Sequence, residues 1–457
     1  MNHLRFTALG GALEIGANSY HVEIDGVPLL LDTGMHPKKN GRDALPLFDA
    51  VSERPVEAIL LSHCHLDHLG ALPEAMKRNP HAGVYLSEPS ALLAPRMLGN
   101  MASVLRHQFR QGGPSPVYGF TEVDMLAQLL EGERFAKPFA IRRGLGGDKG
   151  PIEAVFHHAG HIIGAAGIEL RTNDFRFFYT GDTCAADQDI IPGAYYPEGP
   201  FDVLHMECTT AGDDTAELHS RAKETESFAT AVREVLQREG VVLIPAFALG
   251  RTQEMLKIIH ALIESGDIPK VPIFISGLGR AVAQVYDDTR FQSTRKDPAF
   301  RLASINYHVL ERNDVQAQRP PKDPCIILAT SGMIHPHTPS NLLVRSILPN
   351  PKNGIFFVGY CDTEAPGYRV LNAKPGDEVQ LEEGGPTYTA RAQIARFHFS
   401  AHSVRGDLLK MVERMRPKKI ILIHGGKRSL SWMQNALQGF AHCPEILVPE
   451  PGVSYEM

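Results

Sequence analysis

The sequence has little of several features that mark specialised classes of protein. It carries one Trp and six cysteines in 457 residues, and no two cysteines form a Cys-x-x-Cys pair. Six scattered cysteines in so long a chain are no disulfide framework, so we expect reduced, mostly packed thiols. No apolar run approaches the roughly 20 residues that a spanning helix needs, and the N-terminus lacks the apolar core of a signal peptide. These absences predict a cytoplasmic protein without membrane contact.

The sequence also lacks a surplus of positive charge. Lys and Arg number 46 against 52 Asp and Glu, a formal net charge of −6 at pH 7. Because no overall positive field attracts nucleic acid, a polyanionic ligand must be held by a local patch or by metal. The content of 43% hydrophobic and 21% charged residues is that of an ordinary folded protein, and the length predicts two or three domains.

Segment types change along the chain. Up to about residue 205, short β-rich runs separated by turns predict sheets with helices packed outside. From about residue 219, amphipathic helices alternate with strands that are apolar on both faces, which predicts a parallel α/β domain. After about residue 385 short strands return, followed by a helix at 405–415 and a buried strand before His424. We therefore predict an inserted domain at 209–385 between two parts of a first domain, 1–208 and 386–457.

The strongest motif is LSHCHLDHLG at residues 61–70. His63, His65, Asp67 and His68 directly follow an apolar strand, and residues in such a loop can converge on one point. Imidazole nitrogen with carboxylate oxygen is a ligand set suited to Zn²⁺. The alternative is a surface loop that is merely rich in histidine.

Three further candidates lie at the ends of other strands. His161 lies on a glycine-flanked turn, Asp182 follows the apolar run FFYTG, and His424 follows IILI and precedes two glycines. Each of them alone is more often a packing or turn residue than a ligand. Together with the histidine-rich loop, they indicate one metal centre assembled from distant segments.

Several motifs resemble those of a known family. HCHLDH, GHIIGAA, YTGDT and IHGG, in this order, look like the metal motifs of the metallo-β-lactamase superfamily, and LLLDTG with Asp32 resembles its opening aspartate motif. MECTT, IPAFALGRTQE, ILATSGM and FHFSAHS are similar to the β-CASP branch of RNA-processing nucleases, which includes RNase J and the messenger-RNA 3′-end endonuclease. The resemblance covers nearly the whole chain. It implies a metallo-β-lactamase αββα sandwich with an inserted parallel α/β β-CASP domain.

The resemblance also implies two Zn²⁺ per chain. It assigns His63, His65 and His161 to one zinc, and Asp67, His68 and His424 to the other. It assigns Asp182 to both. In this family Asp32 supports the metal loop by hydrogen bonding without binding metal.

Catalytic roles follow from the same resemblance. It implies that His402 is the general acid, that Glu207 orients it, and that Asp67 belongs to the catalytic set. Many relatives carry aspartate directly after the acid histidine, whereas here Ser403 follows.

Two arginines are candidates for contacts to phosphate. Arg251 and Arg280 each follow a strand and begin a helix, where the helix N-terminus also favours anions, although a solvated surface role is the alternative. The glycine-rich stretch at 144–150 lacks the spacing of a phosphate-binding loop, so we predict a turn there.

These inferences together predict a zinc-dependent ribonuclease that cleaves RNA in a groove between the two domains. Two metals activate hydroxide, and the His402–Glu207 pair protonates the leaving group. Single-stranded DNA is a second substrate class, and a homodimer is left open. The alternatives are a metallohydrolase acting on DNA or on a small ester or phosphodiester, and a non-catalytic scaffold.

Overall fold

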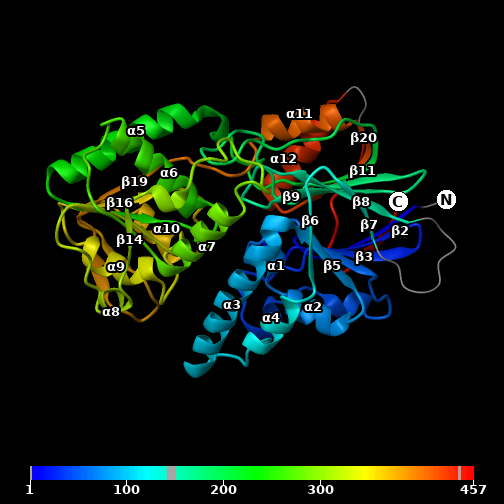
Figure 1. The fold of residues 1–457 in the computed structure, drawn as a ribbon, viewed down its shortest axis with the longest axis horizontal. Helices are drawn as coiled ribbons and strands as arrows, with labels where there is room; N and C mark the ends of the chain where they lie inside the picture. Colours follow the sequence, from blue (N-terminus) through cyan, green and yellow to red (C-terminus); the bar gives the residue numbers. More distant parts are fainter. Residues whose placement is uncertain (1–2, 142–150, 441–443) are drawn as a thin grey trace. The chain divides into compact units, whose positions relative to one another are not determined.

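The computed structural model describes residues 3–141, 151–440 and 444–457. The predicted turn at 144–150 and Cys443 therefore lie outside the described residues. The chain forms two compact units (Figure 1), the first with residues 1–217, 291–295 and 401–457, the second with residues 218–290 and 296–400. The five described cysteines are free and buried, as predicted.

Two mixed seven-stranded sheets build the first unit. In spatial order, the first sheet contains β22 (Ser454–Glu456), β1 (Leu4–Gly10), β2 (Ser19–Ile24), β3 (Val27–Leu31), β4 (Ala58–Leu60), β5 (Gly83–Ser87) and β6 (Leu130–Glu133). The second contains β21 (Glu445–Leu447), β20 (Pro417–Ile423), β11 (Phe201–Glu207), β10 (Arg176–Tyr179), β9 (Ala166–Arg171), β8 (Glu153–His158) and β7 (Pro138–Ala140). The C-terminal strands β20, β21 and β22 thus complete both sheets.

One apolar core lies between the two sheets. Phe6 and Tyr20 of the first sheet and Phe156, Phe177 and Tyr179 of the second all belong to it and are buried almost completely. Helices cover the outer faces: α1 (Leu66–Leu69), α2 (Leu72–Arg78), α3 (Glu88–Arg110) and α4 (Phe120–Leu126) accompany the first sheet, and α11 (Arg405–Met415) and α12 (Lys427–Gln438) the second. The order helix, sheet, sheet, helix confirms the predicted αββα sandwich.

Helix α3 was not predicted. It runs for 23 residues although Pro95 lies inside it, and proline normally ends a helix because it removes a backbone donor. Burial of Leu93, Met97 and Leu105 on one face compensates for this defect. A tertiary contact surface therefore overrides a weak local propensity.

The second unit contains a six-stranded sheet in which all neighbouring strands are parallel, as predicted. Its strands, in spatial order, are β14 (Tyr307–Val309), β13 (Ile273–Ile275), β15 (Cys325–Ala329), β12 (Val241–Pro245), β16 (Gly354–Phe357) and β19 (Gln393–Arg396). Its helices are α5 (Arg221–Gln237), α6 (Arg251–Glu264), α7 (Gly277–Asp288), α8 (Arg312–Gln316), α9 (Pro339–Ile347) and α10 (Pro366–Leu371), and a small hairpin joins β17 (Glu378–Gln380) to β18 (Thr387–Thr389). Short 3-10 helices lie at Gly41–Ala44, Phe48–Val51, Ala216–Leu218 and Leu302–Ser304.

The chain returns to the first unit later than the boundary predicted at residue 386. Strand β19 pairs in parallel with β16 of the second unit, so residues 386–400 belong to the inserted unit, which begins at Leu218 rather than at 209. A short strand with mixed burial carries no local sign of which sheet it joins, because both units contain such strands.

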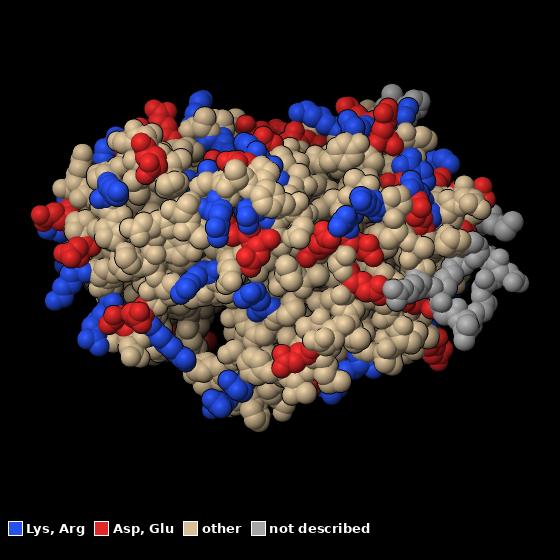
Figure 2. Space-filling model, viewed as in Figure 1, with Lys and Arg blue, Asp and Glu red and all other residues tan. Residues whose placement is uncertain are grey.

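Charged side chains of both signs are interspersed over the face drawn in Figure 2, in keeping with the small net charge. Within the described residues, no helix has the length and apolar character required to cross a membrane.

Candidate metal centre

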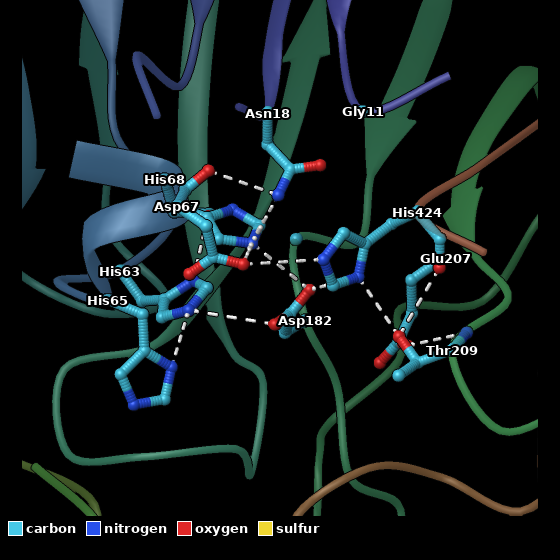
Figure 3. Close-up of polar contacts among 12 residues, drawn as sticks. Gly11, Asn18, His63, His65, Asp67, His68, Asp182, Glu207, Thr209 and His424 are labelled. Atoms are coloured by element: carbon cyan, nitrogen blue, oxygen red, sulfur yellow. Dashed lines mark hydrogen bonds and ion pairs between the residues drawn. The ribbon is translucent and has the colours of Figure 1, made fainter. Parts of the chain in front are cut away.

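The candidate ligands all follow the carboxyl ends of strands in the first unit. His63 to His68 follow β4, His161 follows β8, Asp182 follows β10, and His424 follows β20. Strands β10, β11 and β20 are parallel neighbours, so the residues after them meet at one edge of the sheet. The side chains of the candidate ligands that are labelled in Figure 3, all except His161, accordingly point toward one another.

The first group consists of His63, His65, His161 and Asp182, whose ligand atoms all lie within 4.8 Å of one another. Nδ1 of His65 lies 3.2 Å from Nε2 of His63 and 3.0 Å from Nε2 of His161. Oδ2 of Asp182 lies 3.7 Å from the same two Nε2 atoms. Three imidazoles facing one carboxylate oxygen match the donor set of a zinc site.

The second group consists of Asp67, His68 and His424. Oδ1 of Asp182 reaches this group as well, at 3.3 Å from Nε2 of His68 and 3.0 Å from Nδ1 of His424. Asp67 Oδ2 lies 3.5 Å from Nε2 of His424. The two oxygens of Asp182 therefore face different groups, which is the arrangement that a carboxylate shared by two cations needs.

Unsatisfied polar atoms indicate that the cluster fits a cation. Asp182 Oδ1 and His424 Nε2 are buried, and apart from the ion-pair contacts with other candidate ligands neither makes a hydrogen bond within the described part of the chain. A buried polar atom without a hydrogen bond costs about 1–3 kcal/mol. A cation among these nitrogen and oxygen donors would remove that cost.

The charge states agree with this fit in the first group. Burial, together with the neighbouring rings of His68 and His402, lowers the pKa of His63 and of His161 well below the ordinary value. Both rings are therefore neutral at pH 7, the form that binds metal.

In the second group, burial alone would lower the pKa of His68 and of His424, but the carboxylates of Asp182 and Asp67 raise both, so a cation there would replace protons. Burial alone would raise the pKa of Asp182, but His424 and His68 hold it well below its usual range.

Asp32 orients the second group. Its Oδ1 accepts a hydrogen bond from Ser62 N at 2.6 Å, and its Oδ2 accepts from Ser62 Oγ and Tyr179 OH, both at 2.6 Å. The same Oδ2 lies 2.7 Å from Nδ1 of His68, which leaves Nε2 of that ring facing the cluster. Asp32 itself belongs to none of the candidate metal groups of the described residues.

Asp32→Asn is expected to lower the free energy of unfolding of the metal-free protein by roughly 3–5 kcal/mol. The amide N–H of asparagine would face the buried groups that now donate hydrogen bonds to the Asp32 carboxylate. Asn tolerates the left-handed backbone at this position, where φ is 57°. The measurement is urea unfolding in the presence of chelator. Asp49→Asn, at a side chain that is 90% exposed, is the control and should change stability by less than about 1 kcal/mol. Equal effects of the two substitutions would contradict this view of Asp32.

Gly34 allows the metal loop to approach the segment that carries Asp32, directly after β3. A Cβ atom at Gly34 would lie 1.6 Å from the carbonyl oxygen of Asp67. No side chain fits at that distance, so the glycine of the LLLDTG motif is required by close packing.

Glu207 and His402 lie beside the cluster. Glu207, at the end of β11, is buried and accepts hydrogen bonds from Thr183 N at 2.7 Å and Thr209 N at 3.2 Å. Its Oε1 lies 3.1 Å from Nδ1 of His402, and both residues form a candidate group with Asp182. Burial alone would lower the pKa of His402, but the Glu207 carboxylate raises it, so this ring holds a proton more firmly than a free histidine.

Ser403 stabilises the loop that carries His402 through hydrogen bonds. Its Oγ accepts a hydrogen bond from Ala185 N at 2.9 Å and lies 3.3 Å from Tyr196 OH. Its own N–H donates to Thr183 O at 2.7 Å. A neutral network thus connects the His402 loop to the loop that follows Asp182, at the position where many relatives carry aspartate.

Ser403→Ala is expected to reduce the turnover number kcat of a reaction at this cluster about fivefold, because the loss of one buried hydrogen bond of about 1 kcal/mol leaves His402 less firmly positioned. Zinc content and KM should stay within twofold of the wild type. Steady-state kinetics with metal analysis tests this, with Ser52→Ala at an exposed turn as the control. A proportional loss of zinc would contradict a role limited to positioning.

Sequence reasoning missed two neighbours of the ligands. Nδ2 of Asn18 lies 2.9 Å from Nε2 of His68 and donates to Asp67 O at 3.1 Å. Oγ1 of Thr209 lies 2.9 Å from Nδ1 of His424. Thr209 belongs to the MECTT motif, which could have indicated it, whereas Asn18 lies in a loop with no motif.

The two arginines predicted to contact phosphate belong to the second unit. Arg251 is only 6% exposed, and its guanidinium donates to Phe399 O at 2.7 Å. Arg280, in the first turn of α7, is exposed. Contact of either with phosphate stays a prediction.

Comparison with known families decides the classification. The model of the metallo-β-lactamase superfamily matches residues 13–223, that of the β-CASP domain 252–370, and that of the Zn-dependent metallo-hydrolase RNA specificity domain 387–448. This chain belongs to the metallo-β-lactamase superfamily, in its β-CASP branch. The predicted family is thereby confirmed, and one of the three matched models, that of residues 387–448, describes a Zn-dependent metallo-hydrolase.

Relatives of this β-CASP protein match along nearly its whole length. It is 27% identical to "Cleavage and polyadenylation specificity factor 73" of Drosophila melanogaster, with 95% of this chain and 62% of the relative covered. It is 28% identical both to "Endoribonuclease YSH1" of Eremothecium gossypii, covering 95% and 56%, and to "Transcription termination factor FttA" of Lokiarchaeum, covering 93% and 67%. The chain thus spans about half to two thirds of these relatives.

A solved structure shares the fold of this β-CASP protein. A crystal structure of a protein of unknown function from Enterococcus faecalis aligns with a TM-score of 0.56 at 15% identity, with 99% of this chain and 100% of the other covered.

Proposed function

We propose that this protein is a zinc-dependent ribonuclease that hydrolyses RNA phosphodiester bonds. The observation that carries the proposal is the position of Asp182, whose two carboxylate oxygens face two separate groups of ligands. We assign His63, His65 and His161 to one zinc, and Asp67, His68 and His424 to a second. Two zinc ions at this centre would supply positive charge to the phosphate and lower the pKa of water.

The chain's own groups complete the chemistry. In our proposal His402 donates a proton to the leaving oxygen of the scissile phosphate. Glu207 is the positioning residue, because it accepts two backbone hydrogen bonds and contacts Nδ1 of His402. Nε2 of His402 is then the atom that donates. General acid catalysis of this kind contributes roughly 10²–10⁴-fold in rate.

The RNA substrate is supported by the match of residues 387–448 to an RNA specificity domain, and by relatives whose names describe an endoribonuclease. This chain covers only part of the length of those relatives, so we propose the same activity for it. Cytoplasmic location, homodimerisation and the use of single-stranded DNA remain predictions of the sequence.

The test compares zinc-loaded protein on three substrates: a single-stranded RNA, a DNA of the same sequence, and bis(p-nitrophenyl) phosphate. We expect about two zinc ions per chain and hydrolysis of RNA at least tenfold faster than of DNA. His161→Ala, which removes one ligand, should hydrolyse none of the three and controls for contaminating nuclease. Hydrolysis of the small ester alone would overturn the RNA substrate. Full activity in metal-free protein would overturn the zinc centre.

A further inference from the structure

Helix α3 carries a stripe of arginines on its solvent face. Arg96, Arg106 and Arg110 are exposed, and at 100° per residue they fall within an arc of about 80°. The opposite face of the helix packs into the first unit. The three arginines are therefore presented to solvent together.

The stripe is free of carboxylates. The sequence has no acidic residue between Glu88 and Glu122, although the chain as a whole is acidic. Glu88 pairs with Arg134 at 3.2 Å, and Glu122 lies 3.5 Å from Lys77 and caps the N-terminus of α4. Within the described ranges, no ion pair involves any arginine of the stripe, and Asp124 is the exposed carboxylate on the adjacent α4. The stripe is thus a local patch of positive charge.

Aromatic rings accompany the charge near the end of the helix. Phe109 is 51% exposed and Phe120 is 40% exposed. The guanidinium of Arg106 lies 5.0 Å from the centre of the Phe120 ring. Arginine beside exposed aromatic rings is the combination on which unpaired bases stack while the backbone is held by charge.

The helix starts at the metal centre. Cys64, between two candidate ligands, donates its thiol hydrogen to Ser90 O at 3.3 Å. Ser90 Oγ donates to Gly164 O at 3.0 Å, in the loop that carries His161. Since a helix rises about 1.5 Å per residue, Arg96 and Arg110 lie about 9 Å and 30 Å along the axis from Ser90. In Figure 1 the far end of α3 extends past the other helices of the first unit, and Figure 2 shows basic side chains at that tip.

We propose that the Arg96–Arg106–Arg110 stripe binds the phosphate backbone of single-stranded RNA that extends from the metal centre. The inference rests on the proposed function for its substrate. It adds a surface outside the centre that sets affinity for long RNA and leaves the chemistry at the metals unchanged.

The test replaces all three arginines: Arg96→Gln, Arg106→Gln and Arg110→Gln together. Fluorescence anisotropy with an unstructured RNA 30-mer should show binding weakened at least about tenfold at low salt. The slope of log K against log salt should become less steep by about 2, because each phosphate neutralised on a single strand contributes about 0.7. Hydrolysis of bis(p-nitrophenyl) phosphate, which is too small to reach the stripe, should stay within twofold.

A control variant carries the same change in charge elsewhere: Arg5→Gln, Arg171→Gln and Lys418→Gln. Lys418 is exposed, and Arg5 and Arg171 are partly exposed. They pair with Asp202, Glu456 and Glu153 respectively and lie at the strand ends opposite to the metal centre. The control should bind the 30-mer like the wild type. The proposal would be overturned if both variants weakened RNA binding equally, or if neither variant weakened it.

Other occupants give different results. Binding of phosphatidylserine vesicles through the stripe without binding of RNA, or loss of a dimer in the triple variant by sedimentation, would overturn the RNA assignment. If RNA binds through the stripe but is never hydrolysed, this inference is supported and the proposed function is overturned. If the triple variant hydrolyses RNA with unchanged KM and unchanged salt slope, the proposed function is supported and this inference is overturned.

Discussion

Asp182→Asn is expected to reduce the rate of phosphodiester hydrolysis by roughly 10⁴-fold or more and to lower the zinc content of the purified protein. Its two oxygens face both groups of ligands, so one substitution weakens both cation positions. An amide is uncharged and offers a single acceptor oxygen, and loss of metal removes several kcal/mol of stabilisation from the transition state. Single-turnover hydrolysis combined with metal analysis measures both effects.

A matched control lies in the same loop. Asp187 is exposed and accepts a hydrogen bond from Gly193 N at 2.9 Å, which an asparagine can still accept. Asp187→Asn should keep both zinc content and rate within twofold. If Asp182→Asn retained two zinc ions and near-normal turnover, the shared-carboxylate arrangement would be wrong.

His402→Ala is expected to slow turnover by about 10²–10⁴-fold while the zinc content stays unchanged. The ring contacts Glu207 and lies 4.6 Å, centre to centre, from the His161 ring, yet in our proposal it binds no metal. The variant should therefore separate protonation of the leaving group from assembly of the centre. The measurement is kcat on RNA at saturating substrate, with metal analysis of the same sample.

A substrate with a good leaving group provides the control for His402→Ala. p-Nitrophenolate needs little protonation, so the variant should lose much less activity on bis(p-nitrophenyl) phosphate than on RNA. Glu207→Gln should show the same pattern with a smaller effect, because the ring keeps a hydrogen-bonding neighbour. Full activity of His402→Ala on RNA would refute the general-acid assignment.

Much of the fold was predictable because local patterns were strong. The apolar runs at 241–245 and 325–329 and the helix at 405–415 coincide with β12, β15 and α11. Helix α3 and the assignment of β19 were not predictable. The helix contains Pro95, and the strand is short and only partly buried, so tertiary contacts decide both.

The candidate site divides in the same way. The closely spaced ligands of HCHLDH could be predicted to meet at one point because they share a short loop. The positions of His161, Asp182 and His424 at the ends of strands predicted that they join the same site. Asn18 and Ser403 reach the site through loop geometry that no motif records. Arg251 remains between these cases: its guanidinium donates to the backbone carbonyl of Phe399, and its contact with phosphate stays a prediction.

The order of the segments along the chain has a consequence for biosynthesis. His402 and His424 come after the whole inserted unit, and β20 and β22 close the two sheets last. A nascent chain that has emerged only to residue 400 lacks both histidines and cannot cut RNA in the manner proposed. A ribosome that stops before residue 402 would therefore release a fragment that lacks both the proposed general acid, His402, and one proposed zinc ligand, His424.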